Sequence, residues 1–270
     1  MTPKKRRLSY SAFKELEDCS KRYYFNRIAK LSKEEDTSRY IHGTVIQSVI
    51  ENWINKGEHL NPKTARKWLK DNLETTYLTI PDRHKAKWKT PTDEGKMLDV
   101  CRTALDVFVD GVNEWKFLTK NTRCEIEVGG DISPTRHIWG RVDFWIERRD
   151  ELPFILDGKA TAKKIPSNDQ LIYYALATNK SRGFMPKLGF LYYKLGKLDM
   201  VDYSTQDLNA LEERIHESFQ VLETEAWKAN PTNENCFFCE FKESCQEYKD
   251  TVGKKYQKAD PLPFKGVMEL

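Results

Sequence analysis

Apolar side chains recur every three to four positions over roughly residues 9–118, which is the period of an amphipathic helix. The pattern is clearest in 42–55 and 93–118, and a further helix is expected at 63–76. Ser9 and Ser11 offer hydroxyl oxygens that can cap the first helix. The N-terminal region is therefore predicted to be helical, and its apolar faces are expected to form core.

The period changes to two between residues 122 and 203. Residues 123–128 alternate as a strand, and a second strand over 137–147 follows a Ser-Pro turn. The run 154–156 is wholly apolar and ends in charge, which is typical of a central strand buried on both faces. A helix from Ser167 to Asn179 and two more strands, near 185–194 and 198–203, complete a mixed α/β core with helices on the faces of its sheet.

This order divides the chain into a helical region (1–118), an α/β core that ends in a long helix at about 205–228 (119–228), and a cysteine segment with a polar tail (229–270). We expect one compact structural unit. No stretch approaches the roughly 20 apolar residues that span a bilayer. We therefore expect an intracellular protein, cytoplasmic in a bacterium or nuclear in a eukaryotic or viral setting. The net charge of +4 does not identify a partner.

Candidate chemistry lies on two consecutive predicted strands. Asp143 ends the run Gly140-Arg-Val-Asp, and Asp157-Gly158-Lys159 follows the next strand. If these strands pair as a hairpin, both carboxylates converge and form an oxygen site suited to Mg²⁺ or Mn²⁺. Asp157 and Lys159 project from one face, which places an ammonium group beside the expected metal. An isolated Asp-x-Lys is more often part of a surface hairpin with ordinary charged ends. Whether this one belongs to a catalytic site therefore depends on the residues around it.

Those surroundings include a second polar pair. Gln170 follows Lys159 by eleven residues and opens a predicted helix that should pack beside the Asp-Gly-Lys strand. Its amide can hydrogen-bond a metal-bound water or a phosphate, and Tyr174 lies one helical turn later on the same side. Taken alone, this segment would be an amphipathic helix with a polar start.

Four cysteines form a candidate metal site. Cys236, Cys239 and Cys245 have C-x2-C-x5-C spacing, and Cys19 lies near the other end of the chain. Six cysteines in a chain of this size are too few for a disulfide scaffold, and a close-spaced group favours metal binding. Four thiolates suit a [4Fe-4S] cluster and suit structural zinc equally well, so spacing alone leaves both open. Either would add its binding free energy to folding.

Together these motifs resemble the RecB-type branch of the PD-(D/E)XK nuclease superfamily, especially its iron-sulfur members, which include the AddB nuclease domain and CRISPR-adaptation exonucleases. The resemblance extends from the N-terminal Ser-Tyr-Ser and first cysteine to the last cysteine, so it covers most of the chain. It rests on Gly140-x-x-Asp143, Asp157-Gly158-Lys159, Gln170-Leu-x-x-Tyr174-Ala175, and the four cysteines.

The resemblance implies a restriction-endonuclease-like fold and residue roles. Asp143, Asp157 and the main-chain carbonyl of Gly158 are the implied metal ligands, and Lys159 and Gln170 the implied catalytic support. Tyr174 and Arg141 are expected to bind substrate. The four cysteines would hold a [4Fe-4S] cluster, with zinc as the alternative.

The implied activity is a Mg²⁺- or Mn²⁺-dependent DNA nuclease, and an exonuclease is expected. It would act on ends or single strands in recombination, repair or DNA processing. DNA is the expected partner, and a helicase or another recombination protein is a candidate second one. The alternative is a catalytically inactive nucleic-acid-binding or assembly module of the same fold. A zinc-stapled scaffold protein is a more remote alternative.

One position departs from the family pattern. Such enzymes usually carry a metal-binding histidine four residues after a glycine on an early helix, and here Gly43 leads to Gln47. His42 would lie about 140° around the helix from position 47, so it cannot simply substitute. Glu51, one turn after Gln47, can supply an oxygen ligand directly or through water. Gln47 and Glu51 are therefore counted with the expected metal site.

Tryptophan and basic residues of the helical region are candidates for substrate binding. Bases of a single strand could stack on exposed indole rings while cations follow the phosphates. Most tryptophans are core or partly buried, so a structural role is more common for each one. The residues concerned are Trp68, Trp88, Trp115, Arg66, Lys67, Lys70, Lys85, Lys87 and Lys89.

Overall fold

The computed structural model describes residues 5–32, 36–90, 92–115, 118–237 and 239–254. The chain forms two compact units, of which the first comprises residues 1–7 and 35–211 and the second residues 8–34 and 212–270. Each unit combines segments that are distant in sequence. The division into 1–118, 119–228 and 229–270 remains a prediction.

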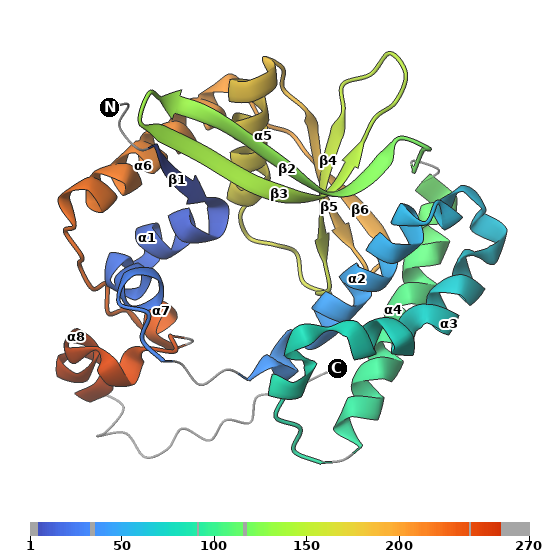
Figure 1. Ribbon diagram of the computed structural model, residues 1–270, viewed down its shortest axis with the longest axis horizontal. Coiled ribbons are helices and arrows are strands. Elements are labelled where there is room, and N and C mark those ends of the chain that lie inside the picture. Colours follow the sequence, from blue (N-terminus) through green and yellow to red (C-terminus); the bar gives the residue numbers. More distant parts are fainter. Residues whose placement is uncertain (1–4, 33–35, 91, 116–117, 238, 255–270) are drawn as a thin grey trace. The chain divides into compact units, whose positions relative to one another are not determined.

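A mixed sheet forms the centre of the fold (Figure 1). Its strand order is β1-β3-β4-β5-β6, and β2 pairs with β3. The β3–β4 hairpin is antiparallel, whereas β4 and β5 run parallel and are connected through a helix. The predicted mixed α/β core is thus confirmed. The strands are β1 (Arg6–Ser9), β2 (Thr122–Ser133), β3 (Arg136–Ile146), β4 (Phe154–Lys159), β5 (Lys187–Tyr192) and β6 (Lys197–Val201).

Helices cover both faces of this sheet. On one face α2 (Ile41–Asn55), α3 (Pro62–Thr79) and α4 (Asp93–Trp115) share a buried apolar cluster with side chains of β3, β4 and β5. On the other face lies α5 (Asp169–Arg182), whose last residue places its guanidinium 4.6 Å from the ring centroid of Trp145 on β3. The short η2 (Thr37–Arg39), η3 (Glu58–Leu60) and η4 (Pro81–Lys85) connect the helices.

The second unit is built from helices and turns. Its elements are α1 (Tyr10–Tyr23), η1 (Tyr24–Ile28), the C-terminal part of α6 (Thr205–Thr224), α7 (Asn233–Phe237), η5 (Lys242–Ser244) and α8 (Gln246–Asp250). The predicted Ser9 cap is present, since its hydroxyl accepts from the Ala12 amide at 3.3 Å. Helix α6 ends earlier than the expected residue 228, because Glu225 adopts a left-handed backbone with φ 53°.

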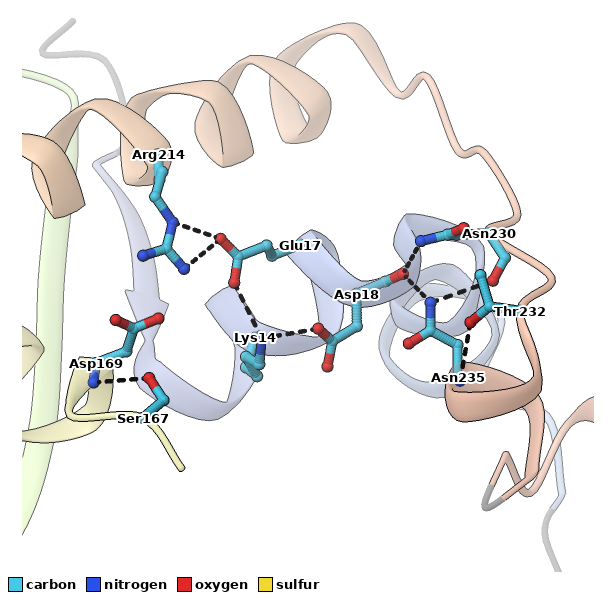
Figure 2. Close-up of polar contacts among 9 residues, drawn as sticks. All are labelled: Lys14, Glu17, Asp18, Ser167, Asp169, Arg214, Asn230, Thr232 and Asn235. Carbon is cyan, nitrogen blue, oxygen red and sulfur yellow. Dashed lines mark hydrogen bonds and ion pairs between the residues drawn. The ribbon is translucent and has the colours of Figure 1, made fainter. Parts of the chain in front are cut away.

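Polar contacts connect α1 to the rest of the second unit (Figure 2). Arg214 on α6 pairs with Glu17, and the main-chain carbonyl of Asp18 accepts from the side-chain amides of Asn230 and Asn235. These contacts hold the two residues before Cys19, whose own φ of −164° interrupts the helix. No helix within the described ranges is long and apolar enough to cross a membrane.

Candidate functional site

The β3–β4 hairpin brings the two predicted aspartates together. Phe144 lies opposite Leu156 in the antiparallel register, so Asp143 and Asp157 occupy the next position along the two strands. Oδ2 of Asp143 accepts a hydrogen bond from the Gly158 amide at 2.7 Å. The carboxylates therefore meet at one end of the hairpin.

A chain of polar groups extends from Asp157 to α5. The ammonium of Lys159 lies 2.5 Å from Asp157 Oδ2, although that buried oxygen makes no well-directed hydrogen bond within the described residues. Lys159 also donates to Gln170 Oε1 at 2.9 Å, and Gln170 Nε2 donates to the Tyr174 hydroxyl at 3.1 Å. Gly140 makes room for this tyrosine, because a Cβ there would lie 2.5 Å from its ring.

A cavity of about 430 Å³ lies beside the hairpin and is lined by the predicted Gln47, Glu51, Asp143 and Gly158, but not by Arg141. Gln47 Nε2 donates to Glu51 Oε1 at 2.7 Å, while its Oε1 accepts from the Tyr193 hydroxyl. The cavity is not lined by the polar chain described above, which comprises Asp157, Lys159, Gln170 and Tyr174. Gly158 lines the cavity and lies between Asp157 and Lys159, so it connects this chain to the cavity. The lining comprises Gly43, Thr44, Gln47, Ser48, Glu51, Glu125, Asp143, Gly158, Ala160 and Tyr193.

Glu125 and Tyr193 were not expected in the site from the sequence. Glu125 occupies a left-handed backbone position, φ 56°. It lies between two paired residues of β2, since Cys124 pairs with Phe144 and Ile126 with Val142, but Glu125 itself has no partner in the described β2–β3 register. This irregularity places its carboxylate at the cavity, 3.3 Å from the guanidinium of Arg141. Alternation alone could not reveal it. Tyr193 follows an apolar strand and gave no signal distinct from core.

Burial makes the carboxylates of this site poor acids. The pKa of Asp143 is raised well above its ordinary value by burial and by the charge of Asp157. The pKa of Asp157 is also raised by burial, against the opposing effect of Lys159. Burial, opposed by the hydrogen bond from Gln47 and reinforced by the charge of Glu125, raises the pKa of Glu51 to about 7. The site therefore carries uncompensated negative charge when ionised.

These donors fit a hard divalent cation. Carboxylate and main-chain oxygens are the ligands that Mg²⁺ and Mn²⁺ prefer, and a cation would offset the repulsion between Asp143 and Asp157. Within the described ranges, no three His, Cys, Asp or Glu side chains are gathered closely enough to hold a metal ion as they stand. The expected third ligand, the carbonyl of Gly158, is a main-chain atom.

The second unit gathers the four predicted cysteines around one small pocket of about 20 Å³. The Asn230 amide donates to Cys19 Sγ at 3.4 Å, and main-chain amides of Phe241 and Tyr248 hydrogen-bond Cys239 and Cys245. Burial and the neighbouring thiols raise the pKa of Cys236, as burial does for Cys239 and Cys245. Thiolates here would need a cation to compensate them, and sulfur donors are the type that a soft metal takes, but among the described residues these thiols are not close enough together, as they stand, to hold one.

Comparison with known families decides the affiliation of the chain. The sequence model of the PD-(D/E)XK nuclease superfamily matches residues 7–246. The chain belongs to the PD-(D/E)XK nuclease superfamily. The match covers both units and includes the hairpin aspartates, Lys159 and all four cysteines of the pocket. No curated protein sequence matches the chain significantly.

Solved structures support the same fold. A candidate exonuclease from Eubacterium rectale has a TM-score of 0.51 at 11% identity, with 83% of this chain and 84% of that chain covered. This superfamily member thus has the restriction-endonuclease-like fold, a mixed sheet flanked by helices. The structure of SSO0001 is less similar, with a TM-score of 0.41 and 12% identity. That match covers 92% of this chain and 89% of the SSO0001 chain.

Proposed function

We propose that this PD-(D/E)XK protein is a Mg²⁺- or Mn²⁺-dependent DNA nuclease of the RecB-type branch, an exonuclease that hydrolyses phosphodiester bonds at DNA ends or in single strands. The observation that carries the proposal is the meeting of Asp143, Asp157 and Lys159 around Gly158 on one hairpin. Superfamily membership and the likeness to a candidate exonuclease support it. Recombination, repair or DNA processing is the proposed setting, and a helicase or another recombination protein the proposed partner.

Asp143, Asp157 and the Gly158 carbonyl would hold the divalent cation, and Glu51 with Gln47 would complete its surroundings from α2. When bound, such a cation lowers the pKa of a water molecule and polarises a phosphodiester. The ammonium of Lys159 stabilises negative charge on the phosphate during attack. Gln170 orients that ammonium through its 2.9 Å hydrogen bond, and Tyr174 orients Gln170 in turn.

A [4Fe-4S] cluster is our proposal for the four cysteines, with zinc as the alternative. Thiolate ligands and main-chain N–H donors to sulfur suit such a cluster. Its role would be structural, because it would join α1 to the segment 236–245. Anaerobic purification tests this. A brown protein with visible thiolate-to-iron absorption and about four irons supports the cluster, whereas a colourless protein containing zinc would replace it with a zinc site.

The activity is tested with end-labelled single- and double-stranded DNA in Mn²⁺ or Mg²⁺. Wild type should release short products from ends, while Asp157→Ala and Lys159→Ala should lose at least about a hundredfold in rate. Each variant is matched by Lys197→Ala, which changes an exposed lysine of β6 that pairs with Asp199. Identical products from wild type and both site variants would remove the nuclease proposal.

A non-catalytic nucleic-acid-binding or assembly module is the second candidate. It is favoured by one observation, the glutamine at position 47 where the family usually has a metal-binding histidine. Tight DNA binding by wild type without cleavage in any divalent cation would select this function over the nuclease.

A further inference from the structure

A polar groove separates α2 from α3 in the first unit. Its volume is about 120 Å³, and it is lined by Asn52 on α2, by Lys56 directly after that helix, and by Trp68, Asn72 and Thr76 on α3. The Asn52 amide lies 3.5 Å from the Thr76 hydroxyl, and the Lys56 ammonium lies 5.4 Å from the ring centroid of Trp68. Among the residues that the structure describes, no carboxylate lines the groove. It therefore combines a flat aromatic ring, a cation and neutral hydrogen-bonding groups.

This groove begins one helical turn from the carboxylate cavity. Ser48 and Glu51 line that cavity from α2, and Asn52 lies four residues after Ser48 on the same side of the helix. At 1.5 Å per residue, Lys56 is about 8 Å beyond Glu51 along the helix axis. Stacked nucleotides advance about 3.4 Å each, so roughly two nucleotides span this distance.

Lys56 differs from the other basic residues of this region. Arg66 pairs with Asp106 and Asp110, and Lys70 with Asp106. Within the described part of the chain no carboxylate pairs with Lys56, whose side chain is exposed. A phosphate would therefore not have to displace an existing ion pair, which makes Lys56 the better cation for binding it.

Trp68 likewise differs from the other candidate tryptophans. Trp68 and Trp88 both pack against the buried cluster, but the Trp88 ring also hydrogen-bonds Tyr77, whereas Trp68 lines the groove. The side chain of Trp115 lies outside the described residues. Trp68 is half-buried, lines the groove and carries Lys56 above its ring. A ring held in this way is a stacking platform for a base.

We propose that the α2–α3 groove binds one nucleotide of a single strand, with its base stacked on Trp68 and its phosphate paired with Lys56. The inference rests on the proposed nuclease function, because it assigns the path by which the strand leaves the carboxylate cavity. The bound nucleotide lies about two positions from the scissile phosphate. Asn52 and Asn72 present amides to the base edge without selecting one base.

Binding is measured separately from cleavage to test this. Full-length protein carrying Asp157→Asn is titrated against a fluorescent oligothymidine in the absence of Mn²⁺, and anisotropy gives Kd. Trp68→Ala should weaken binding about 10- to 100-fold, and Trp68→Phe should stay within about threefold of Trp68. Lys56→Ala should weaken it several-fold and reduce the salt slope by about one. Lys197→Ala, at an exposed lysine of β6 that pairs with Asp199, is the matched control and should change Kd less than about twofold.

A single abasic position moved along the oligonucleotide locates the base. At one position, removing the base should weaken binding as much as Trp68→Ala does. Combining that abasic position with Trp68→Ala should then weaken binding no further. Because Lys56 is exposed, Lys56→Ala keeps the test valid even if Trp68→Ala proves unstable. If wild type cleaves DNA while both variants bind like the control, the groove assignment is wrong and the nuclease proposal stands. If wild type neither binds nor cleaves nucleic acid, the proposed function fails and the inference with it.

Discussion

The carboxylate site of the first unit and the cysteine pocket of the second differ in how they are supported. The first stands on central strands over a large buried cluster, and hydrogen bonds between its own residues already set its geometry. The second lies on short helices and turns, where Phe25, Phe241 and Cys245 form a small buried cluster. The fold therefore sets the geometry of the carboxylate site. In the cysteine pocket, the proposed metal centre would itself stabilise the fold of the second unit.

This difference predicts opposite consequences of losing a ligand. A carboxylate site mounted on a rigid sheet loses chemistry when a donor is removed, but the sheet persists. A pocket of thiols would depend on the proposed metal centre for stability, because the binding free energy of the metal would then be folding free energy.

The largest effect is expected from Cys239→Ser. Loss of one thiolate should release the metal centre and lower the free energy of unfolding of the second unit by more than about 4 kcal/mol. Limited proteolysis should then cleave within 8–34 and 212–254 while the first unit resists. Cys101→Ala is the control, since Cys101 is buried on α4 of the first unit and does not line the pocket. Equal protease resistance of wild type and Cys239→Ser would contradict the supporting role of the centre.

Gly158→Ala should produce the next largest effect, now in the first unit. A Cβ at this position would lie 1.8 Å from the Tyr193 hydroxyl and 2.8 Å from Gln47 Oε1. Displacing a fully buried tyrosine should cost about 2–3 kcal/mol of stability. Removing the hydroxyl with Tyr193→Phe should recover part of the loss, which thermal unfolding of the two single variants and the double variant measures. No recovery in the double variant would show that the clash lies elsewhere.

Much of the first unit could be predicted because its signals are local. The helices at 42–55 and 63–76 agree with α2 and α3 within a few residues, and the hairpin follows from alternation. Two features could not be predicted. Glu125 reaches the cavity through a left-handed residue that interrupts strand pairing, and Tyr193 through packing from a distant strand. The periodicity of the sequence does not indicate the position of either residue at the cavity.

The second unit was less accessible to sequence reasoning. The cysteine spacing predicted that Cys19 would meet the C-terminal cysteines, and they do line one pocket. The break in α1 at Cys19 and the early end of α6 at Thr224 depend on tertiary contacts, such as those made by Asn230 and Asn235 to Asp18. Long-range contacts of this kind override the local preferences that a pattern records.

A smaller effect is expected in the pH dependence of stability. Glu51 has a pKa of about 7 in the folded protein against 4.5 in an exposed carboxyl. Between these values the folded state retains a proton that the unfolded state has released, so stability falls as pH rises from about 4.5 to 7. We expect about 1–2 kcal/mol for the metal-free protein, because solvent screens this partly exposed group. Asp143 and Asp157 act in the same direction.

Thermal unfolding at pH 5 and pH 7.5 checks this expectation, with and without Mn²⁺. Glu51→Gln should reduce the fall between the two pH values, and Mn²⁺ should raise the melting temperature more at pH 7.5 than at pH 5. A metal-free protein that gains stability from pH 5 to 7.5 would contradict the direction. The cysteine pocket provides the contrast, since its thiol pKa values lie higher and contribute little in this window.

The smallest effect is expected from Gln47→His, which restores the residue usual in the superfamily branch. Gln47 is held between the Tyr193 hydroxyl and Glu51, so its position already faces the cavity. An imidazole there could bind the divalent cation directly, and Mg²⁺-supported cleavage should be retained or raised by up to about tenfold. Gln47→Ala is the control and should lower cleavage, because Glu51 loses its hydrogen-bond donor. Complete loss of cleavage in a folded Gln47→His protein would mean that the amide itself is required, and that the carboxylate site tolerates a changed donor no better than the cysteine pocket does.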